Sequence, residues 1–292
     1  MKLVRFGPRG RERPGVLDAE GGIRDLGGIV DDFVGEGIGL AAIDRIRALD
    51  ATRLPLVGGE VRLGPPVGRV GNFIAIGLNF ADHAAETGAR IPFEPILFNK
   101  APSCLSGPND DIVLPPEALK GDWEAELAVV MGRPAYRVSE TEALDYVAGY
   151  AICNDVSERA WQGEGTGQWV KGKSAPTFGP LGPWLVTADE VPDPQALEIA
   201  LDRNGKRQQT GSTRTMIFSV AELISFISRR FALETGDVIT TGTPPGVGHG
   251  MRPQQFLKPG DTLRITITGL GEQNQRVIAL AEESPEKDVV AR

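Results

Sequence analysis

Strand-forming apolar residues fill most of residues 123–131 and predict a strand that ends at Gly132-Arg133-Pro134. Successive side chains on a strand point to opposite faces, so Glu124 and Glu126 are expected on one face as near neighbours. A second apolar run, residues 147–153, predicts a buried strand that ends at Asn154-Asp155. An isolated Glu-x-Glu is usually a solvated strand face. Asp155, which follows the next strand, adds a third carboxylate close to this pair. We therefore prefer the hypothesis that the three carboxylates form one site.

The rest of the pattern predicts many short strands separated by turns. We expect strands over 3–6, 16–17, 73–77, 184–186, 197–203, 238–241, 263–268 and 276–280, and helices over 40–49 and from Ser219 to about Phe231. The 37 glycines and 22 prolines agree with a turn-rich chain. These elements predict a mainly β fold of the α+β type, with a boundary in the glycine- and proline-rich stretch 64–68. We therefore expect a small N-terminal α/β domain, 1–68, and a catalytic domain, 69–292.

Composition excludes several classes of protein. The net charge of −8 argues against binding to nucleic acid or to an anionic membrane. No run approaches the roughly 18 apolar residues needed to span a bilayer, and the N-terminus lacks the apolar centre of a signal peptide. The two cysteines, Cys104 and Cys153, form no disulfide framework and indicate a reducing compartment. The sequence thus predicts a soluble cytoplasmic protein.

The candidate functional residues are three carboxylates, which could bind a metal ion, and a histidine with a neighbouring glutamate, which could act as a general base. Glu124, Glu126 and Asp155 together form an all-oxygen donor set, which suits Mg²⁺ or Mn²⁺ better than Zn²⁺. The alternative for Asp155 is a cap on the turn that follows it. His83 and Glu86 are three residues apart on an expected helical turn, where a carboxylate can orient an imidazole as a general base. The alternative for this pair is an ordinary exposed helix.

Two glycine-containing segments resemble anion-binding loops. Residues 167–174 match the phosphate-loop pattern G-x-x-x-x-G-K-[ST], but no hydrophobic strand precedes them and Pro176 disfavours a helix after them. We therefore expect no nucleotide binding there, and Lys173 remains as a lone cation near an anionic site. The loop 242–248 follows a buried strand, so the backbone amides around Gly242 and Thr243 can approach an anion closely.

Four blocks in order carry a resemblance to the fumarylacetoacetate hydrolase family: residues 77–86 (GLNFADHAAE), 122–130 (DWEAELAVV), 154–159 (NDVSER) and 241–248 (TGTPPGVG). The resemblance covers about three quarters of the chain. It implies a mixed β-roll catalytic domain, a homodimer or dimer-based oligomer, and Mg²⁺- or Mn²⁺-dependent cleavage of a carbon–carbon bond in β-diketo acids.

The resemblance also implies roles for individual residues. It assigns metal ligation to Glu124, Glu126 and Asp155, catalysis to His83, Glu86 and Lys173, and substrate binding to Arg159, Gln162, Gly242 and Thr243. Two positions depart from the family pattern, in which Asp commonly stands where this chain has Ala160 and Pro176. These departures concern substrate specificity more than reaction class.

The implied reaction is hydrolysis of the C3–C4 bond of a 2,4-diketo acid to pyruvate and a carboxylic acid. The segments 171–174, 177–187 and 246–251 are similar to the branch of the family that acts on 2,4-diketo-3-deoxy sugar acids derived from L-rhamnonate or L-fuconate. Members of that branch give lactate as the second product. Acetylpyruvate or fumarylpyruvate hydrolysis, oxaloacetate decarboxylation and isomerisation are alternatives on the same scaffold. A binding module without catalytic activity is the least favoured alternative.

Overall fold

The computed structural model describes residues 1–88 and 90–281, without the side chains of His83 and Thr87. Within this part of the chain, the largest sheet has 11 strands. Its main path runs β3 (Ile23–Asp25), β2 (Arg13–Leu17), β1 (Lys2–Phe6), β13 (Gly179–Thr187), β11 (Val147–Asn154), β10 (Ala125–Met131), β16 (Val238–Thr240), β5 (Phe73–Gly77) and β6 (Ile96–Lys100). Two short strands join it at the side, β4 (Leu63–Gly64) on β1 and β7 (Leu105–Ser106) on β13.

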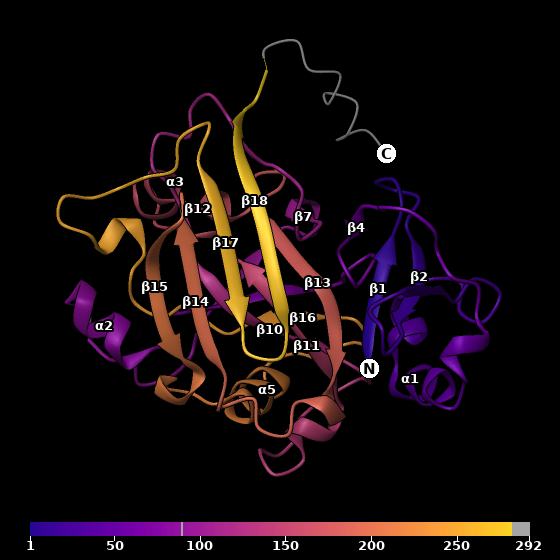
Figure 1. Cartoon of the computed structure of the whole chain (residues 1–292). Helices are drawn as coiled ribbons and strands as arrows, with labels where there is room; N and C mark the ends of the chain where they lie inside the picture. The colour runs from indigo at the N-terminus through magenta and orange to yellow at the C-terminus, as the bar shows by residue number, and fades with distance from the viewer. Residues whose placement is uncertain (89, 282–292) are drawn as a thin grey trace.

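A second sheet packs against the centre of the first. In the described residues it has five strands: β15 (Lys206–Ser212), β14 (Glu198–Arg203), β17 (Thr262–Ile267), β18 (Gly271–Ala279) and β8 (Ile112–Leu114). Strands β14, β17 and β18 contact β10, β11 and β13, and Figure 1 shows this sheet in front of them. The pairing of β5 with β16 is parallel and that of β10 with β11 is antiparallel, so the fold is mixed. The expected mainly β fold is confirmed.

The α-helices of the described residues are short. They are α1 (Leu40–Arg47), α2 (Ala81–Thr87), α3 (Arg159–Gly163), α4 (Val170–Lys173) and α5 (Val220–Ser228). Short 3₁₀ helices occupy connections at Gly35–Ile38, Ala51–Arg53, Pro102–Cys104, Ala143–Tyr146, Ala188–Glu190, Thr213–Thr215 and Gly248–Gly250. None of the helices in the described residues has the length and apolar character needed to cross a membrane.

The N-terminal segment is joined to the large sheet by hydrogen bonds. Strand β1 pairs with β13 through Lys2 opposite Val186 and Leu3 opposite Leu185. In Figure 1 this segment, with β1, β2 and α1, lies at one side of the two packed sheets. The division at residue 68 stays a prediction.

The strand that carries the two glutamates begins later than expected. Residues 121–122 form β9 and pair with β12 (Ser157–Glu158), so the chain bends at Trp123 and Glu124 before β10 begins at Ala125. Gln209 of the second sheet stabilises this bend, because its side-chain oxygen accepts a hydrogen bond from Ala125 N at 3.0 Å. All seven residues of β10 are buried. Glu126 therefore lies inside the protein rather than on a solvated strand face.

The capping box that begins α5 should contribute measurably to stability. The Ser219 side chain accepts from Glu222 N, and the Glu222 carboxylate accepts from Ser219 N, as the sequence predicted. Ser219→Ala should lower the free energy of unfolding by about 0.5–2 kcal/mol, the usual cost of a lost N-cap. Urea denaturation measures this change. The exposed loop variant Thr166→Ala is the control, and an equal loss there would contradict the role of the cap.

Candidate metal and active site

The three predicted acidic residues meet where strand β10 begins and strand β11 ends. Ala125 pairs with Asn154, and Asp155 N donates to the Glu124 carbonyl oxygen at 2.9 Å, so this register brings Asp155 beside the two glutamates. One carboxylate oxygen from each of Glu124, Glu126 and Asp155 lies within 4.8 Å of the others, and all three residues are buried. The sequence-based grouping of these residues is confirmed in space.

Two cations lie between the carboxylates and hold them together. Lys173 Nζ lies 2.7 Å from Glu124 Oε2 and 2.7 Å from Asp155 Oδ2. Arg159 Nη2 lies 2.6 Å from Glu124 Oε1, although its N–H directions are poorly aligned with the oxygen, so this contact is an ion pair rather than a well-formed hydrogen bond. Buried carboxylates this close repel one another unless cations compensate them. Lys173 and Arg159 provide that compensation.

The two glutamates titrate in opposite directions. Burial alone would raise the pKa of Glu124, but Arg159 and Lys173 outweigh burial and lower the pKa to about 2. Burial raises the pKa of Glu126 well above its usual value, and the charges of Asp155 and Glu124 raise it further. The hydrogen bond from Gly242 N to Glu126 Oε2, 2.9 Å long, offsets only part of this effect. Glu126 thus holds a proton more readily than Glu124 when no metal is bound.

Asp122 is a buried carboxylate that the sequence analysis did not select. It accepts hydrogen bonds from Gly248 N at 2.7 Å and His249 N at 3.0 Å, and it also accepts from Arg159 Nε at 2.8 Å. One side chain therefore fastens the glycine-rich loop after β16 to the arginine that contacts Glu124. The sequence held a signal, because Asp122 shares a block with Glu124.

A cavity of about 60 Å³ opens onto the carboxylates. It is lined by Ile76, Gly77, Leu78, Phe98, Glu124, Glu126, Arg159, Gln162, Trp169, Lys173 and Thr243. Arg159 and Gln162 lie on the same wall, since Gln162 Oε1 accepts from Arg159 Nη1 at 3.0 Å. Thr243 Oγ1 donates to the Ala125 carbonyl oxygen at 2.9 Å. Three of the four expected substrate-binding residues line the cavity, whereas the fourth, Gly242, directs its N–H to Glu126.

The expected catalytic pair lies on α2, beside the glycine-rich loop. The Glu86 carboxylate accepts from Gly246 N, with distances of 3.0 and 3.2 Å to its two oxygens. This contact ties α2 to the loop that also supplies Gly242. The side chain of His83 lies outside the described residues, so the pairing of His83 with Glu86 stays a prediction.

The phosphate-loop pattern at 167–174 has no phosphate-loop architecture. Residues 163–169, all of which the structure describes, form no strand, and α4 contains only four residues. The Lys173 ammonium is directed to Glu124 and Asp155. The segment contributes Trp169 instead, whose ring meets the Phe98 ring edge-on at a centroid distance of 5.2 Å and forms an apolar wall of the cavity. The sequence analysis did not select Trp169, because the phosphate-loop pattern assigns a role to Lys173 and none to the tryptophan.

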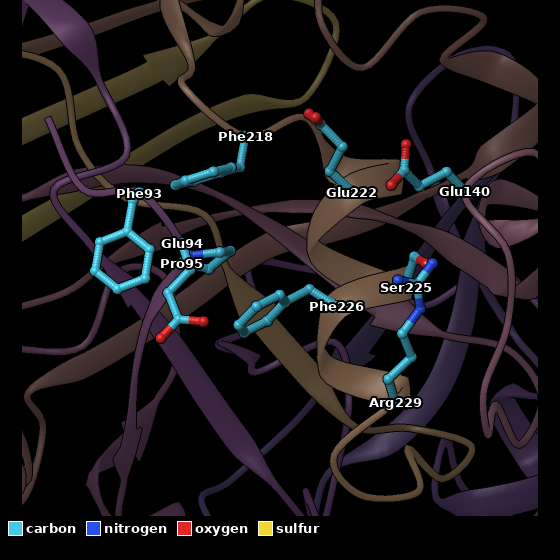
Figure 2. Close-up of a pocket in the computed structure, with 9 residues that line it drawn as sticks. All are labelled: Phe93, Glu94, Pro95, Glu140, Phe218, Glu222, Ser225, Phe226 and Arg229. Atoms are coloured by element: carbon cyan, nitrogen blue, oxygen red, sulfur yellow. The ribbon is translucent and has the colours of Figure 1, made fainter.

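Neither of the two departures from the family pattern lines the cavity. Neither Ala160, in α3, nor Pro176, which is exposed, is among the residues that line it. A larger hollow of about 220 Å³ lies elsewhere, against α5 (Figure 2). Figure 2 shows Phe93, Phe218 and Phe226 on one side of it, with the Glu94 carboxylate between Phe93 and Phe226, and shows Glu140, Glu222 and Arg229 on the other side. Volume does not select the candidate site, because the charged residues Glu124, Glu126, Arg159 and Lys173 line the smaller cavity.

Comparison with known proteins agrees with the geometry. The family model described as fumarylacetoacetate (FAA) hydrolase C-terminal matches residues 72–278. A protein of Burkholderia multivorans, provisionally named a hydrolase, is 58% identical over 276 residues, which is 94% of this chain and 98% of the relative. The chain therefore belongs to the fumarylacetoacetate hydrolase family.

Solved structures of enzymes share the fold. Fumarylacetoacetate hydrolase from Exiguobacterium antarcticum is similar with a TM-score of 0.84 and 38% identity, over 96% of this chain and 100% of that one. A probable 2-hydroxyhepta-2,4-diene-1,7-dioate isomerase from Mycobacterium abscessus has a TM-score of 0.81 and 33% identity, with the same coverage. Maleylpyruvate hydrolase from Sphingobium sp. SYK-6, solved with manganese(II) ion and pyruvate, has a TM-score of 0.81 and 28% identity, again with that coverage.

The raised pKa of Glu126 predicts a pH-dependent stability in metal-free protein. The unfolded chain loses this proton near pH 4.5 and the folded chain at higher pH, so the group costs stability as pH rises above about 4.5. Glu126→Gln mimics the protonated form and should unfold at a higher temperature than wild type at pH 7 in EDTA. The difference should vanish near pH 4, where both side chains are uncharged. Thermal scans across this pH range test the prediction, and a less stable variant at pH 7 would contradict it.

Proposed function

We propose that the protein is a hydrolase that depends on a divalent metal ion and cleaves the C3–C4 bond of a 2,4-diketo acid, giving pyruvate and a carboxylic acid. The observation that carries this proposal is the buried triad of Glu124, Glu126 and Asp155, with oxygens within 4.8 Å, at a cavity that also holds Lys173 and Arg159. Family membership supports the reaction class. The manganese and pyruvate bound to the maleylpyruvate hydrolase support the metal and the pyruvyl product.

The donor set fits Mg²⁺ or Mn²⁺. Three carboxylates offer only hard oxygen ligands, and no cysteine or histidine sulfur or nitrogen belongs to the described cluster. The raised pKa of Glu126 is also consistent with a metal site. Burial favours the protonated carboxyl group, and a bound divalent ion would take the place of that proton. The ion, when bound, would act as a Lewis acid toward the carbonyl oxygens of the substrate.

The residues of the chain divide the remaining tasks. Lys173 and Arg159 present positive charge to the cavity, where an anionic diketo acid would bind. His83, oriented by Glu86, would remove a proton from the water that attacks the C4 carbonyl carbon. The C3–C4 bond then breaks, and its electron pair passes to the pyruvyl fragment as the enolate, which takes a proton at C3. Glu86 is suited to an orienting role, because Gly246 N fixes its carboxylate.

The shape of the cavity favours a short acyl group with a polar substituent. Arg159, Gln162 and Thr243 supply polar atoms, while Trp169 and Phe98 supply an apolar wall. A 2,4-diketo-3-deoxy acid derived from L-rhamnonate or L-fuconate has this character. A site that hydrogen-bonds a hydroxyl group discriminates strongly against analogues that lack it. We therefore propose such a sugar acid as the substrate. From membership of the family we also propose a homodimer or a dimer-based oligomer as the working assembly.

The isomerase among the similar structures supports a second candidate reaction. A panel of 2,4-diketo acids with Mg²⁺ or Mn²⁺ separates the two, with release of pyruvate as the measurement. Release of pyruvate fastest from the 5-hydroxy-2,4-diketo acid agrees with the full proposal. Faster cleavage of acetylpyruvate or fumarylpyruvate would refute the sugar acid alone. Isomerisation of a dienedioate, or decarboxylation of oxaloacetate, without release of pyruvate from any diketo acid would refute hydrolysis.

Metal affinity should depend on each carboxylate of the triad. Glu124→Gln, Glu126→Gln or Asp155→Asn should each weaken Mn²⁺ binding, because each removes a charged ligand. The loss in affinity should exceed about 10–100-fold, which is the usual loss when only a residue that orients a ligand is removed. Titration calorimetry measures the affinity. Glu158→Gln is the matched control, since Glu158 is a buried carboxylate that caps α3 outside the triad. Equal losses in the control and the triad variants would contradict the ligand assignment.

The glycine at the end of β5 should set the position of the tryptophan wall. A Cβ atom on Gly77 would lie 2.8 Å from Trp169 Cη2 and nearer still to Cζ3, so the ring has to move. Gly77→Ala should lower kcat/KM roughly tenfold or more, because small misplacements of the substrate are costly, and should leave Mn²⁺ affinity unchanged. Gly163→Ala, where the added methyl group meets open space, is the control. Unaltered turnover in Gly77→Ala would rule out Trp169 as a substrate-positioning wall.

A further inference from the structure

Lys100 is a fully buried lysine that neither the sequence motifs nor the cavity identify. It ends strand β6, is 1% exposed, and does not line the cavity at the carboxylates. Burial alone would lower the pKa of Lys100, but Asp155 outweighs burial, so the pKa is raised and the side chain is charged. A buried charge is costly unless it is well paired, so its partners indicate what it does.

The partners of Lys100 belong to two different segments of the site. Its Nζ donates to Asp155 Oδ1 at 2.6 Å and to the Lys173 carbonyl oxygen, with a longer contact of 3.5 Å to the Val156 carbonyl oxygen. The other oxygen of that carboxylate, Asp155 Oδ2, accepts from Lys173 Nζ. Asp155 is therefore held at both oxygens, by a different lysine at each.

These contacts close a ring through three residues. Lys100 Nζ bonds Asp155 Oδ1, Asp155 Oδ2 bonds Lys173 Nζ, and the Lys173 carbonyl returns to Lys100 Nζ. The ring fixes the rotation of the Asp155 carboxylate and the backbone from which the Lys173 ammonium extends. An adjacent contact, Ala101 N to Ser174 Oγ at 2.8 Å, joins the same two segments without touching the ring.

We propose that Lys100 is a positioning residue, which holds the Asp155 carboxylate and the Lys173 ammonium in fixed relation to each other and does not contact the substrate. This inference rests on the proposed function of the site. Residues that hydrogen-bond to metal ligands and orient them commonly affect metal affinity or activity. A pure counter-charge would be a different role, and the two roles predict opposite effects on metal affinity.

Titration of the metal alone distinguishes the two roles. Lys100→Met keeps the length of the side chain but removes its charge and donors, and it should weaken Mn²⁺ binding about 10–100-fold in calorimetry. Removing a cation would by itself strengthen the attraction of the carboxylates for Mn²⁺. Unchanged or tighter binding in folded Lys100→Met would therefore overturn the proposal. Ser174→Ala breaks the adjacent contact only and should bind Mn²⁺ like wild type, and a loss equal to that of Lys100→Met would assign the effect to general packing.

A double-mutant cycle tests whether Lys100 acts through Lys173. If it does, the Lys100→Met/Lys173→Met protein, assayed with Mn²⁺ at concentrations that saturate every variant, should lose no more kcat/KM than Lys173→Met alone, because the two losses overlap. Losses that multiply would show independent roles and overturn the inference. If wild type binds Mn²⁺ but cleaves no diketo acid, the proposed reaction is refuted, while the calorimetric comparison still decides the role of Lys100.

A measurement on wild type covers the case in which Lys100→Met does not fold. In protein labelled with ¹⁵N-lysine, the buried ammonium groups of Lys100 and Lys173 should give slowly exchanging signals, assigned through Lys173→Met. Both signals should shift when diamagnetic Mg²⁺ is added, because the ring includes a ligand of the ion. A Lys100 signal that does not respond to Mg²⁺ binding would overturn the proposal.

Discussion

Burial of several carboxylates in one place is the constraint on which the rest of this structure depends. Two unit charges 4 Å apart interact by about 4 kcal/mol at an effective dielectric constant of 20, so such a group cannot persist without compensation. The charged residues involved are Asp122, Glu124, Glu126 and Asp155 with Lys100, Arg159 and Lys173. Four carboxylates against three cations leave one net negative charge, and the raised pKa of Glu126 lets a proton neutralise it. A divalent ion in place of that proton leaves the site positive and suited to an anionic substrate.

The β architecture makes this arrangement possible by bringing three strand ends together. Glu126 lies on β10, Asp155 follows β11, and Gly242 follows β16. The registers in which β10 pairs with β11 and with β16 fix the positions of these three residues along the strand direction. The backbone N–H of Gly242 donates to Glu126, and a positive φ of 91° allows this approach. Asp122 then fastens the glycine-rich loop to Arg159. The loop and the charged cluster thus support each other.

Local patterns in the sequence predicted the strands and the acidic triad, because both depend on short-range sequence patterns. Glu126 follows from its place in an apolar run, and Asp155 follows from its place at the end of another. Glu124, which alternation placed on the same strand as Glu126, instead lies just before β10 begins. Lys100 could not be predicted in this way, since its partners are 55 and 73 residues away and only the pairing of β6 with β5 brings it inside. Trp169 was hidden for a similar reason, because its contacts with Gly77 and Phe98 arise from tertiary packing.

The central claim is that the buried triad holds a divalent cation at which a diketo acid is cleaved. The most direct measurement is an anomalous difference map from a crystal grown with Mn²⁺ and pyruvate. The account predicts one strong peak bonded to oxygens of Glu124, Glu126 and Asp155, with pyruvate in the cavity beside Lys173 and Arg159. A triad still bridged by Lys173 with no peak between its oxygens, at a manganese concentration that supports turnover, would contradict it.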